Sequence, residues 1–331
     1  LDVAKRHFYR LRHRLQESKF ISNFARKLSK GIKSINHFME KKHYNDFGSW
    51  IREQLGTKVQ KISIDAGFSC PNRDGSKGTG GCVFCDNKTF SPSYCEGTKN
   101  VKQQMIEGIN FFKRKYNDIR YLAYFQSYTN TYAPVEKLKR LYEEALGVDD
   151  VAGIVIGTRP DCVSDEVLDY LEHLNRQTFM IVEYGIESVN NHTLENIRRG
   201  HTFECSQDAI ARTNERSITV GGHLILGLPG EMREDNIKAA VEISKTRIDI
   251  LKLHQLQIVK NTFLANEYLE KQFHVFDVDE YIELVASFIQ HTRKDIVFDR
   301  FASQSPADMI IAPKWCIKSH EFTDKLDNYL R

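Results

Sequence analysis

From residue 59 onward, short apolar runs alternate with longer amphipathic segments. Runs rich in β-branched and aromatic residues predict six strands, at Val59–Ala66, Arg120–Ser127, Val151–Gly157, Thr178–Gly185, Ile218–Gly227 and Asp249–Ile258. Between them, apolar residues recur three or four positions apart, which predicts helices over Val101–Tyr116, Pro134–Leu146, Ser164–His173, Asn190–Arg216 and Asp235–Thr246. Strands that alternate with helices in this way form parallel βαβ units.

Two of the predicted strands, at 153–157 and 223–227, are apolar on both faces, as expected of strands covered on both sides. Six such units can form an open, doubly wound sheet or an incomplete barrel. In both architectures ligands bind at the carboxyl ends of the strands. After Thr262 we expect a helix, a short strand and a closing helix in the same domain, because no Pro- or Ser-rich linker intervenes, at Asp277–Thr292, Asp295–Arg300 and Glu321–Leu330.

The first 43 residues differ from the rest in charge. They hold 12 Lys and Arg against three acidic residues, a balance of +9, so the other 288 residues sum to −6 within a net charge of +3. Their apolar residues recur at helical spacing, which predicts a basic amphipathic leader over residues 1–45, ahead of a core domain with a C-terminal extension over 46–331. Three interpretations stay open for the leader: a solvated helix packed on the body, a nucleic-acid-binding arm, or a transit or membrane-surface helix.

The composition narrows the class of protein. No uninterrupted apolar run approaches the ~18 residues of a membrane-spanning helix, so we expect no membrane span. Seven cysteines is an odd number, and no secretory signal precedes them. We therefore expect a reduced, cytoplasmic setting, in which clustered cysteines bind metal or take part in chemistry.

A cysteine loop follows the first predicted strand. Cys70, Cys82 and Cys85 have the spacing C-x11-C-x2-C, and Cys95 follows after nine further residues. A CxxC pair brings two thiolates onto one metal site, and a third cysteine completes a three-point clamp. From the spacing alone, three interpretations stay open: an iron–sulfur cluster with one open iron, a zinc site closed by Cys95 as fourth ligand, and unrelated structural thiols.

The loop and a series of dispersed motifs resemble the radical S-adenosylmethionine (SAM) superfamily. Within it, the x11 spacing departs from the commonest x3 and is similar to that of the YhcC-like proteins, relatives of the catalytic subunit of Elongator. The similar segments are DAGFSCPNRDG (65–75), GGCVFC (80–85), FQSYTNTYAP (125–134), GTRPDCV (157–163), VEYGIES (182–188), NIRRGHT (196–202), GHLILGLPGE (222–231), KLHQLQIVKNTFLA (252–265) and SPADMIIAPKWCIK (305–318).

The resemblance implies an α/β fold, a partial (βα)6 TIM-like barrel of the radical SAM type with an N-terminal helical extension. It also implies that Cys70, Cys82 and Cys85 hold a [4Fe–4S] cluster whose open iron binds the amino and carboxylate groups of SAM. Cys95, Cys162, Cys205 and Cys316 would then be ordinary thiols. It assigns no protein side chain to the chemical step.

Further positions follow from the same resemblance as candidate SAM contacts. Gln126, Ser127 and Thr129 lie where relatives hold the methionyl amino group, although the usual GGE sequence is absent. Arg199 matches an arginine that contacts the SAM carboxylate, with a surface salt bridge as the plainer alternative. The other candidates are a polar pair on the fourth predicted strand and two glycines that let the adenine approach the fifth, namely Glu183, Glu187, Gly222 and Gly227.

The function implied is a radical SAM enzyme that reductively cleaves SAM at the cluster to make a 5′-deoxyadenosyl radical. Kinship with Elongator indicates tRNA, and in particular wobble-uridine side chains, as the substrate. An electron donor such as flavodoxin or ferredoxin is expected. Two alternatives stay open: a non-enzymatic zinc or iron–sulfur electron-transfer protein, and a radical SAM enzyme that acts on a protein or small metabolite.

Overall fold

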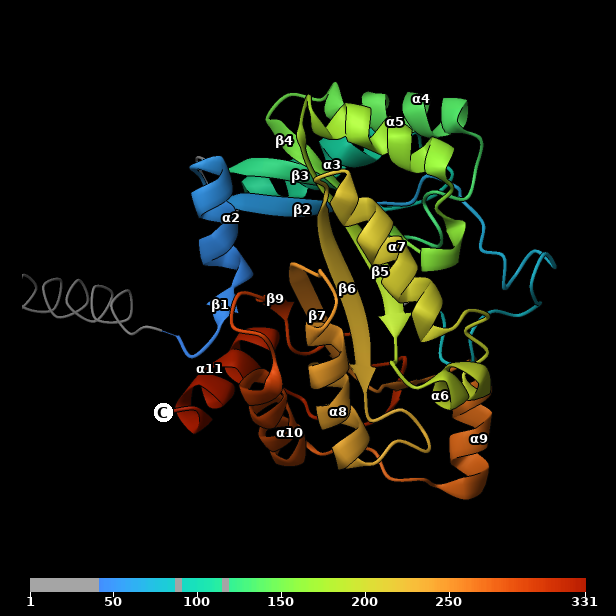
Figure 1. The fold of residues 1–331 in the computed structure, drawn as a ribbon, viewed down its shortest axis with the longest axis vertical. Coiled ribbons are helices and arrows are strands. Elements are labelled where there is room, and N and C mark those ends of the chain that lie inside the picture. Colours follow the sequence, from blue (N-terminus) through green and yellow to red (C-terminus); the bar gives the residue numbers. More distant parts are fainter. Residues whose placement is uncertain (1–41, 87–90, 115–118) are drawn as a thin grey trace, which may run out of the picture. The chain divides into compact units, whose positions relative to one another are not determined.

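A curled sheet of eight parallel strands organises the computed structural model, which describes residues 42–86, 91–114 and 119–331 (Figure 1). The strand order is β1-β9-β7-β6-β5-β4-β3-β2. The strands are β1 (Asn45–Asp46), β2 (Val59–Ile64), β3 (Arg120–Phe125), β4 (Val151–Thr158), β5 (Phe179–Glu187), β6 (Thr219–Leu226), β7 (Ile250–Gln255) and β9 (Val297–Arg300). The six predicted strands and the predicted fold class, a half-barrel of parallel βα units, are confirmed.

Helices follow most strands and cover the convex face of the sheet. They are α3 (Val101–Lys113), α4 (Val135–Leu146), the short 3-10 helix η2 (Pro160–Cys162), α5 (Asp165–Asn175), α6 (Asn191–Asn196), α7 (Phe203–Glu215) and α8 (Arg233–Ser244). The C-terminal part adds α9 (Phe263–Lys271), α10 (Val278–His291) and α11 (Ser319–Tyr329), with a small antiparallel pair, β8 (Ile258–Val259) and β10 (Ile310–Ala312).

Helix α5 illustrates how the sequence specifies these elements. Ser164 caps its amino end by accepting a hydrogen bond from the backbone of Val167, and two acidic residues in the first turn complement the helix dipole. One face of the helix is apolar and buried, through Val167, Leu168, Leu171 and Leu174. The predicted cap and helix are both observed.

The segment Asn190–Arg216, predicted as one helical stretch, is instead divided into α6 and α7. Arg198 and Gly200 adopt positive φ angles of 53° and 76°, which end the first helix. Thr202 then caps α7. The break turns Arg199 inward, where its side chain is buried. The apolar spacing of this segment favours one continuous helix, but the observed chain leaves the helical conformation at Arg198 and Gly200, and Arg199, between the two helices in the sequence, is buried.

Helix α2 (Phe47–Leu55) closes one end of the barrel interior. Its buried residues Phe47 and Ile51 form a cluster with inward-facing residues near the strand starts, including Leu122, Ile181 and Ile250. A larger apolar core lies between the sheet and the outer helices. Because α2 fills the amino-terminal end, the interior is left open only toward the carboxyl ends of the strands.

The predicted leader, residues 1–45, falls almost entirely outside the described residues, which begin at Lys42. The remainder of the chain, Tyr44–Arg331, forms one compact unit, and its C-terminal part packs into it through the pairing of β9 with β7. In the described ranges, we find no helix with the length and apolar character needed to cross a membrane.

Candidate functional site

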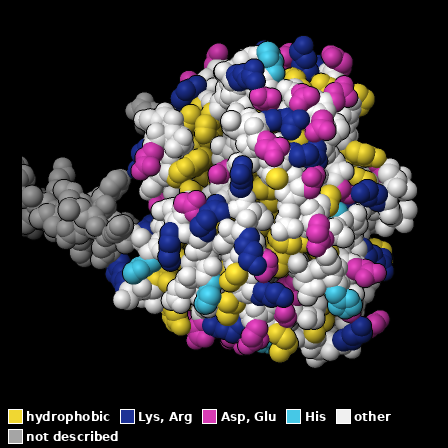
Figure 2. All heavy atoms as spheres, viewed as in Figure 1, with side chains coloured by type: hydrophobic (Ala, Val, Ile, Leu, Met, Phe, Trp, Pro, Cys, Tyr) yellow, Lys and Arg dark blue, Asp and Glu magenta, His cyan; other side chains and the backbone are white. Residues whose placement is uncertain are grey.

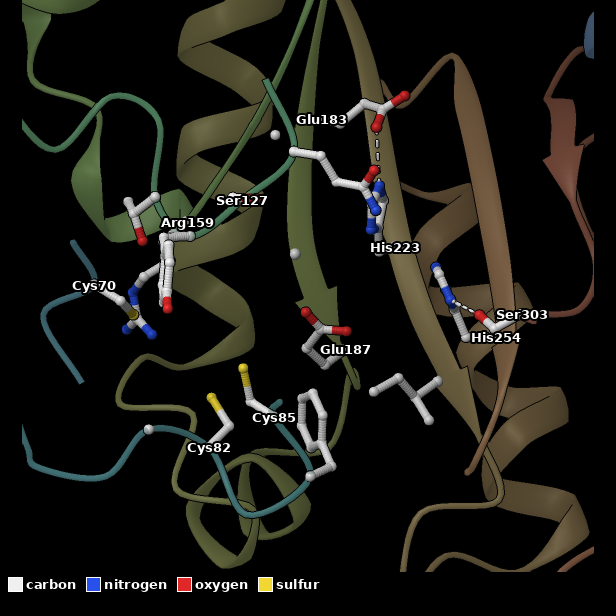
Figure 3. Close-up of a pocket in the computed structure, with 18 of the residues that line it drawn as sticks. Cys70, Cys82, Cys85, Ser127, Arg159, Glu183, Glu187, His223, His254 and Ser303 are labelled. Atoms are coloured by element: carbon white, nitrogen blue, oxygen red, sulfur yellow. Dashed lines mark hydrogen bonds and ion pairs between the residues drawn. The ribbon is translucent and has the colours of Figure 1, made fainter. Parts of the chain in front are cut away.

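One cavity lies at the carboxyl ends of the strands, where the parallel topology predicts a ligand site (Figure 3). The loop after β2 forms one end of it, and residues of β3 to β7 and of β9 form the walls. Cys82 and Cys85 lie side by side at one end, and His223 and His254 lie on the far wall. The lining includes nine of the eleven predicted site residues, namely Cys70, Cys82, Cys85, Gln126, Ser127, Thr129, Glu183, Glu187 and Arg199.

The three loop cysteines all line the cavity, and we call the part of it that they line the cysteine end, Cys70, Cys82 and Cys85. The Sγ atom of Cys82 lies 3.5 Å from Asn72 Nδ2 and 3.7 Å from Arg199 Nη1. Hydrogen bonds to ligand sulfur atoms tune the reduction potential of an iron–sulfur cluster. Burial, with the charge of Cys82 next, raises the pKa of Cys85.

Two glycines directly before the CxxC pair adopt backbone conformations that let the loop after β2 turn sharply. Gly80 and Gly81 have φ angles of 82° and 85°, in the left-handed region that favours glycine. A Cβ atom on Gly81 would lie 2.9 Å from Nε of Arg73, whose guanidinium donates to the carbonyl of Cys85 at 2.8 Å. The glycines therefore let an arginine support the backbone that carries the third cysteine.

Cys95 lies apart from the cysteine end. It does not line the cavity, and its buried thiol neighbours Asp65 and Ser127, with burial raising its pKa to about 11. Across the described residues, no three His, Cys, Asp or Glu side chains are arranged to hold a single metal ion. Cys95 therefore lies outside the set of three cysteines that line the cavity. Three thiols that line an open cavity fit a cluster with one exchangeable iron.

Arg199 and Glu187 stand beside the cysteines. Arg199 donates to the carbonyl of Gly185 at 2.6 Å and lies 3.7 Å from Glu187 Oε1. Burial lowers the pKa of Arg199, but Cys82 and Glu187 outweigh it, so its pKa lies above the usual range. The register of β5 with β6 shifts between Gly185 and Glu187, at the end of β5, and Glu187 lines the cavity there.

Glu183 belongs to a different group, the ionic floor, which we define as Lys61, Glu183, Lys252 and Asp299. Glu183 accepts from Lys61 at 3.0 Å and from Lys252 at 2.6 Å, and Asp299 lies 2.6 Å and 3.4 Å from the same two ammonium groups. Burial raises the pKa of Glu183, but the two lysines outweigh burial and hold it well below its usual range. Its second oxygen also meets His223 Nε2 at 3.0 Å, so its carboxylate is fully engaged.

The end of β3 contributes the polar side chains predicted from FQSYTNT. Gln126 accepts a hydrogen bond from Ser63 at 2.9 Å, and Ser127 is buried. The hydroxyl of Thr129 is buried without a partner among the described residues. An unpaired polar atom in a cavity wall marks a place where a ligand atom would complete the bonding.

Gly222 and Gly227 do not line the cavity. A Cβ atom on Gly222 would lie 2.4 Å from Ile248, and Gly227, with φ 86°, packs against Phe276. Close packing and a tight turn account for both glycines.

Several cavity residues escaped the sequence analysis. Arg159 is 2% exposed and forms a two-pronged pair with Asp161, at 2.8 Å for each bond, while its Nη1 has no partner among the described residues. Arg159 lies in GTRPDCV, a segment the resemblance included without a role. The other cavity residues that were not predicted are His223, His254 and Arg300. Each is a single polar residue on a strand, and the sequence around it does not show that it lines a cavity.

Comparison with known proteins agrees with this fold and site. The family model for the radical SAM superfamily matches residues 74–242, and the radical SAM C-terminal domain matches residues 248–331. The chain belongs to the radical SAM superfamily, and its cofactors are a [4Fe–4S] cluster and S-adenosylmethionine. The predicted family and cofactors are confirmed.

Within the superfamily, the chain is similar to Protein YhcC of Escherichia coli strain K12. The two are 34% identical over 287 residues, which is 86% of this chain and 92% of YhcC. A more distant relative is the tRNA uridine(34) acetyltransferase of Methanocaldococcus jannaschii, 25% identical over 51% of this chain and 32% of that protein. Among solved structures, Elp3 of Methanocaldococcus infernus has the same fold, with a TM-score of 0.63, 17% identity and coverage of 82% of this chain and 62% of Elp3.

Proposed function

We propose that this protein is a radical SAM enzyme whose cluster is held by Cys70, Cys82 and Cys85 and whose substrate is tRNA. The observation that carries the first part is that all three cysteines line one cavity at the carboxyl ends of the strands. When bound and reduced, the cluster supplies the electron that cleaves SAM and leaves a 5′-deoxyadenosyl radical.

The residues around the cysteine end have distinct tasks in this proposal. Arg199 is held by Gly185 and Glu187 so that its positive charge faces Cys82 and any carboxylate bound beside it. The free hydroxyl of Thr129 and the side chains of Gln126 and Ser127 supply hydrogen bonds for the methionyl group. Arg159, which lines the same cavity, supplies one further donor, Nη1, that has no partner among the described residues.

Anaerobic reconstitution tests the cofactor assignment. We expect roughly four irons and four sulfides per chain, and dithionite should then yield 5′-deoxyadenosine from SAM. A colourless protein that binds one zinc would support the non-enzymatic alternative. A properly reconstituted sample that neither holds iron nor cleaves SAM would contradict the proposal.

Two observations support tRNA as the substrate. One relative is a tRNA uridine(34) acetyltransferase, although the chain matches only part of it. The other is the charge of residues 1–43, because basic segments bind phosphate backbones through counterion release. The face seen in Figure 2 instead mixes both signs of charge. The leader is therefore the stronger candidate for RNA binding.

The tRNA proposal is tested by binding and by product analysis. The full chain should bind tRNA with an affinity that falls steeply with salt, and a chain lacking residues 1–43 should bind about tenfold more weakly at low salt. Modified nucleosides in tRNA from a strain without the protein should differ from those of the parent strain. Equal, negligible binding by both proteins, together with unchanged nucleosides, would favour a protein or metabolite substrate.

A further inference from the structure

A β-bulge on β9, the last strand of the eight-stranded sheet along the chain, places an extra charged residue in the cavity. Along β9, Phe298 pairs with Leu251 of β7, but Lys252 pairs with Arg300, so Asp299 has no partner of its own. In a regular strand, neighbouring side chains point to opposite faces. Here the bulge lets both face inward, because Asp299 joins the ionic floor while Arg300 lines the cavity.

Arg300 lines the cavity and, like Arg73, forms no ion pair with a carboxylate of the described residues. Arg73 donates instead to the carbonyl of Cys85 at 2.8 Å. The two lysines of the ionic floor are matched by its two carboxylates. Arg159 pairs with Asp161, and Arg199 lies near Glu187 and the thiol of Cys82. Within residues 42–86, 91–114 and 119–331, no carboxylate pairs with Arg300, and its buried Nε has no hydrogen-bond partner.

His254 lies on the neighbouring strand and also leaves one atom open. Its Nδ1 bonds to the hydroxyl of Ser303, whose backbone is held by Gln255 through bonds of 2.7 and 2.9 Å. Its Nε2 is buried and lacks a partner in the described chain. Burial and then the charge of Arg300 keep the pKa of His254 well below its usual value, so the imidazole is neutral. Either atom of the Nδ1–Ser303 pair can be the donor; in the tautomer in which the Ser303 hydroxyl donates to Nδ1, Nε2 carries the hydrogen and can donate to an oxyanion.

We propose that Arg300, with His254 Nε2 beside it, anchors an oxyanion of the substrate, a carboxylate or a phosphate. A guanidinium takes such a group through two parallel hydrogen bonds, and the partly buried Arg300 has no anion of its own among the described residues. The cysteine end would hold SAM, so the substrate's oxyanion would lie on the far wall of the same cavity. The assignment rests on the proposed function only in identifying the ligand as the substrate.

The test is the midpoint temperature of thermal unfolding, Tm, of the reconstituted full chain. It is measured in sodium acetate, sodium phosphate or sodium chloride at equal ionic strength. We expect acetate or phosphate to raise the midpoint by at least about 2 °C more than chloride, because a ligand that binds only the folded state stabilises it. This increment should vanish in Arg300→Gln and persist in part in Arg300→Lys. The control Arg176→Gln, at an exposed arginine paired with Glu172, should keep it in full.

The two probes separate the sources of the oxyanion. A response to acetate alone identifies a carboxylate, a response to phosphate alone identifies a phosphate, and a response to both supports the shared chemistry. No response to either, or an increment that survives in Arg300→Gln, would overturn the proposal. Without oxyanion, Arg300→Gln should be at least as stable as the wild type, whereas a loss of stability would reveal an internal partner for Arg300 and count against it.

SAM affinity provides the second readout. Arg300→Gln should bind SAM within about twofold of the wild type, whereas a tenfold loss would assign Arg300 to the cofactor and overturn the substrate assignment. The thermal series can be repeated on the full chain without its cluster. A failed reconstitution would therefore contradict the proposed function while leaving the oxyanion test intact.

Discussion

Two groups of polar side chains, the ionic floor and the cysteine end, differ in how their members are paired. In the ionic floor, each charge finds its partner within the chain, at distances of 2.6 to 3.4 Å. At the cysteine end, three cysteines line the cavity, and nearby atoms such as Thr129 Oγ1 and Arg159 Nη1 stay unpaired in the described chain. A satisfied set of charges needs no ligand and stabilises the barrel. An unsatisfied set costs free energy until something binds, so it marks the site of function.

The largest effect should follow from removing a thiol of the cysteine end. Cys82→Ala leaves two cysteines, so we expect iron content to collapse and SAM cleavage to fall by more than about a hundredfold, because even supporting residues of metal sites cost 10- to 100-fold. Iron analysis and the yield of 5′-deoxyadenosine measure this.

The matched control is Cys205→Ala, since Cys205 lies in α7 and does not line the cavity. It should keep both iron and activity. If Cys82→Ala retains a full cluster while Cys205→Ala loses it, the assignment of ligands is wrong.

The next effect should come from the ionic floor, on stability. Glu183→Gln leaves Lys61 and Lys252 with one carboxylate between them, which we expect to cost about 3–5 kcal/mol in the free energy of unfolding. Urea unfolding of the cluster-free chain measures it. The control Glu172→Gln removes an exposed pair with Arg176 and should cost at most about 1 kcal/mol. A stable Glu183→Gln protein that loses SAM affinity would instead make Glu183 a cofactor contact.

The strands and the cysteine end could be predicted from the sequence, whereas the ionic floor could not. The strands were predictable because parallel strands covered on both faces are continuous apolar runs, and β3 and β4 begin at the predicted residues. The cysteine end was predictable because its residues share one loop with a recognisable spacing. The position of Arg199 was harder to predict, because it depends on the break between α6 and α7, where Arg198 and Gly200 have positive φ angles.

The ionic floor and the far wall were not predictable because they depend on pairing between distant strands. Period-two alternation indicates that Lys61 or Lys252 faces one side, but not that both meet Glu183. The bulge that turns Arg300 inward exists only in the register of β9 with β7. Helix α2 was also missed.

A smaller effect concerns pH and the far wall. The pKa of His254 is depressed in the folded chain, so below about pH 6.5 the unfolded chain binds one proton more, and stability falls as the pH falls. The slope from this group is at most about 1.4 kcal/mol per pH unit. His254→Gln should therefore flatten the change in unfolding free energy between pH 7.5 and 5.5, measured in urea. An unchanged slope would show that His254 is not buried in its neutral form.

The central claim, three thiol ligands and one open iron, is tested most directly by electron paramagnetic resonance of the reduced, reconstituted protein with and without SAM. We predict that SAM shifts the g values of the cluster, and that it does so equally in the wild type and in Cys95→Ala. A wild-type spectrum that SAM leaves unchanged, with a shift appearing only in Cys95→Ala, would contradict the account, because Cys95 would then be occupying the fourth iron.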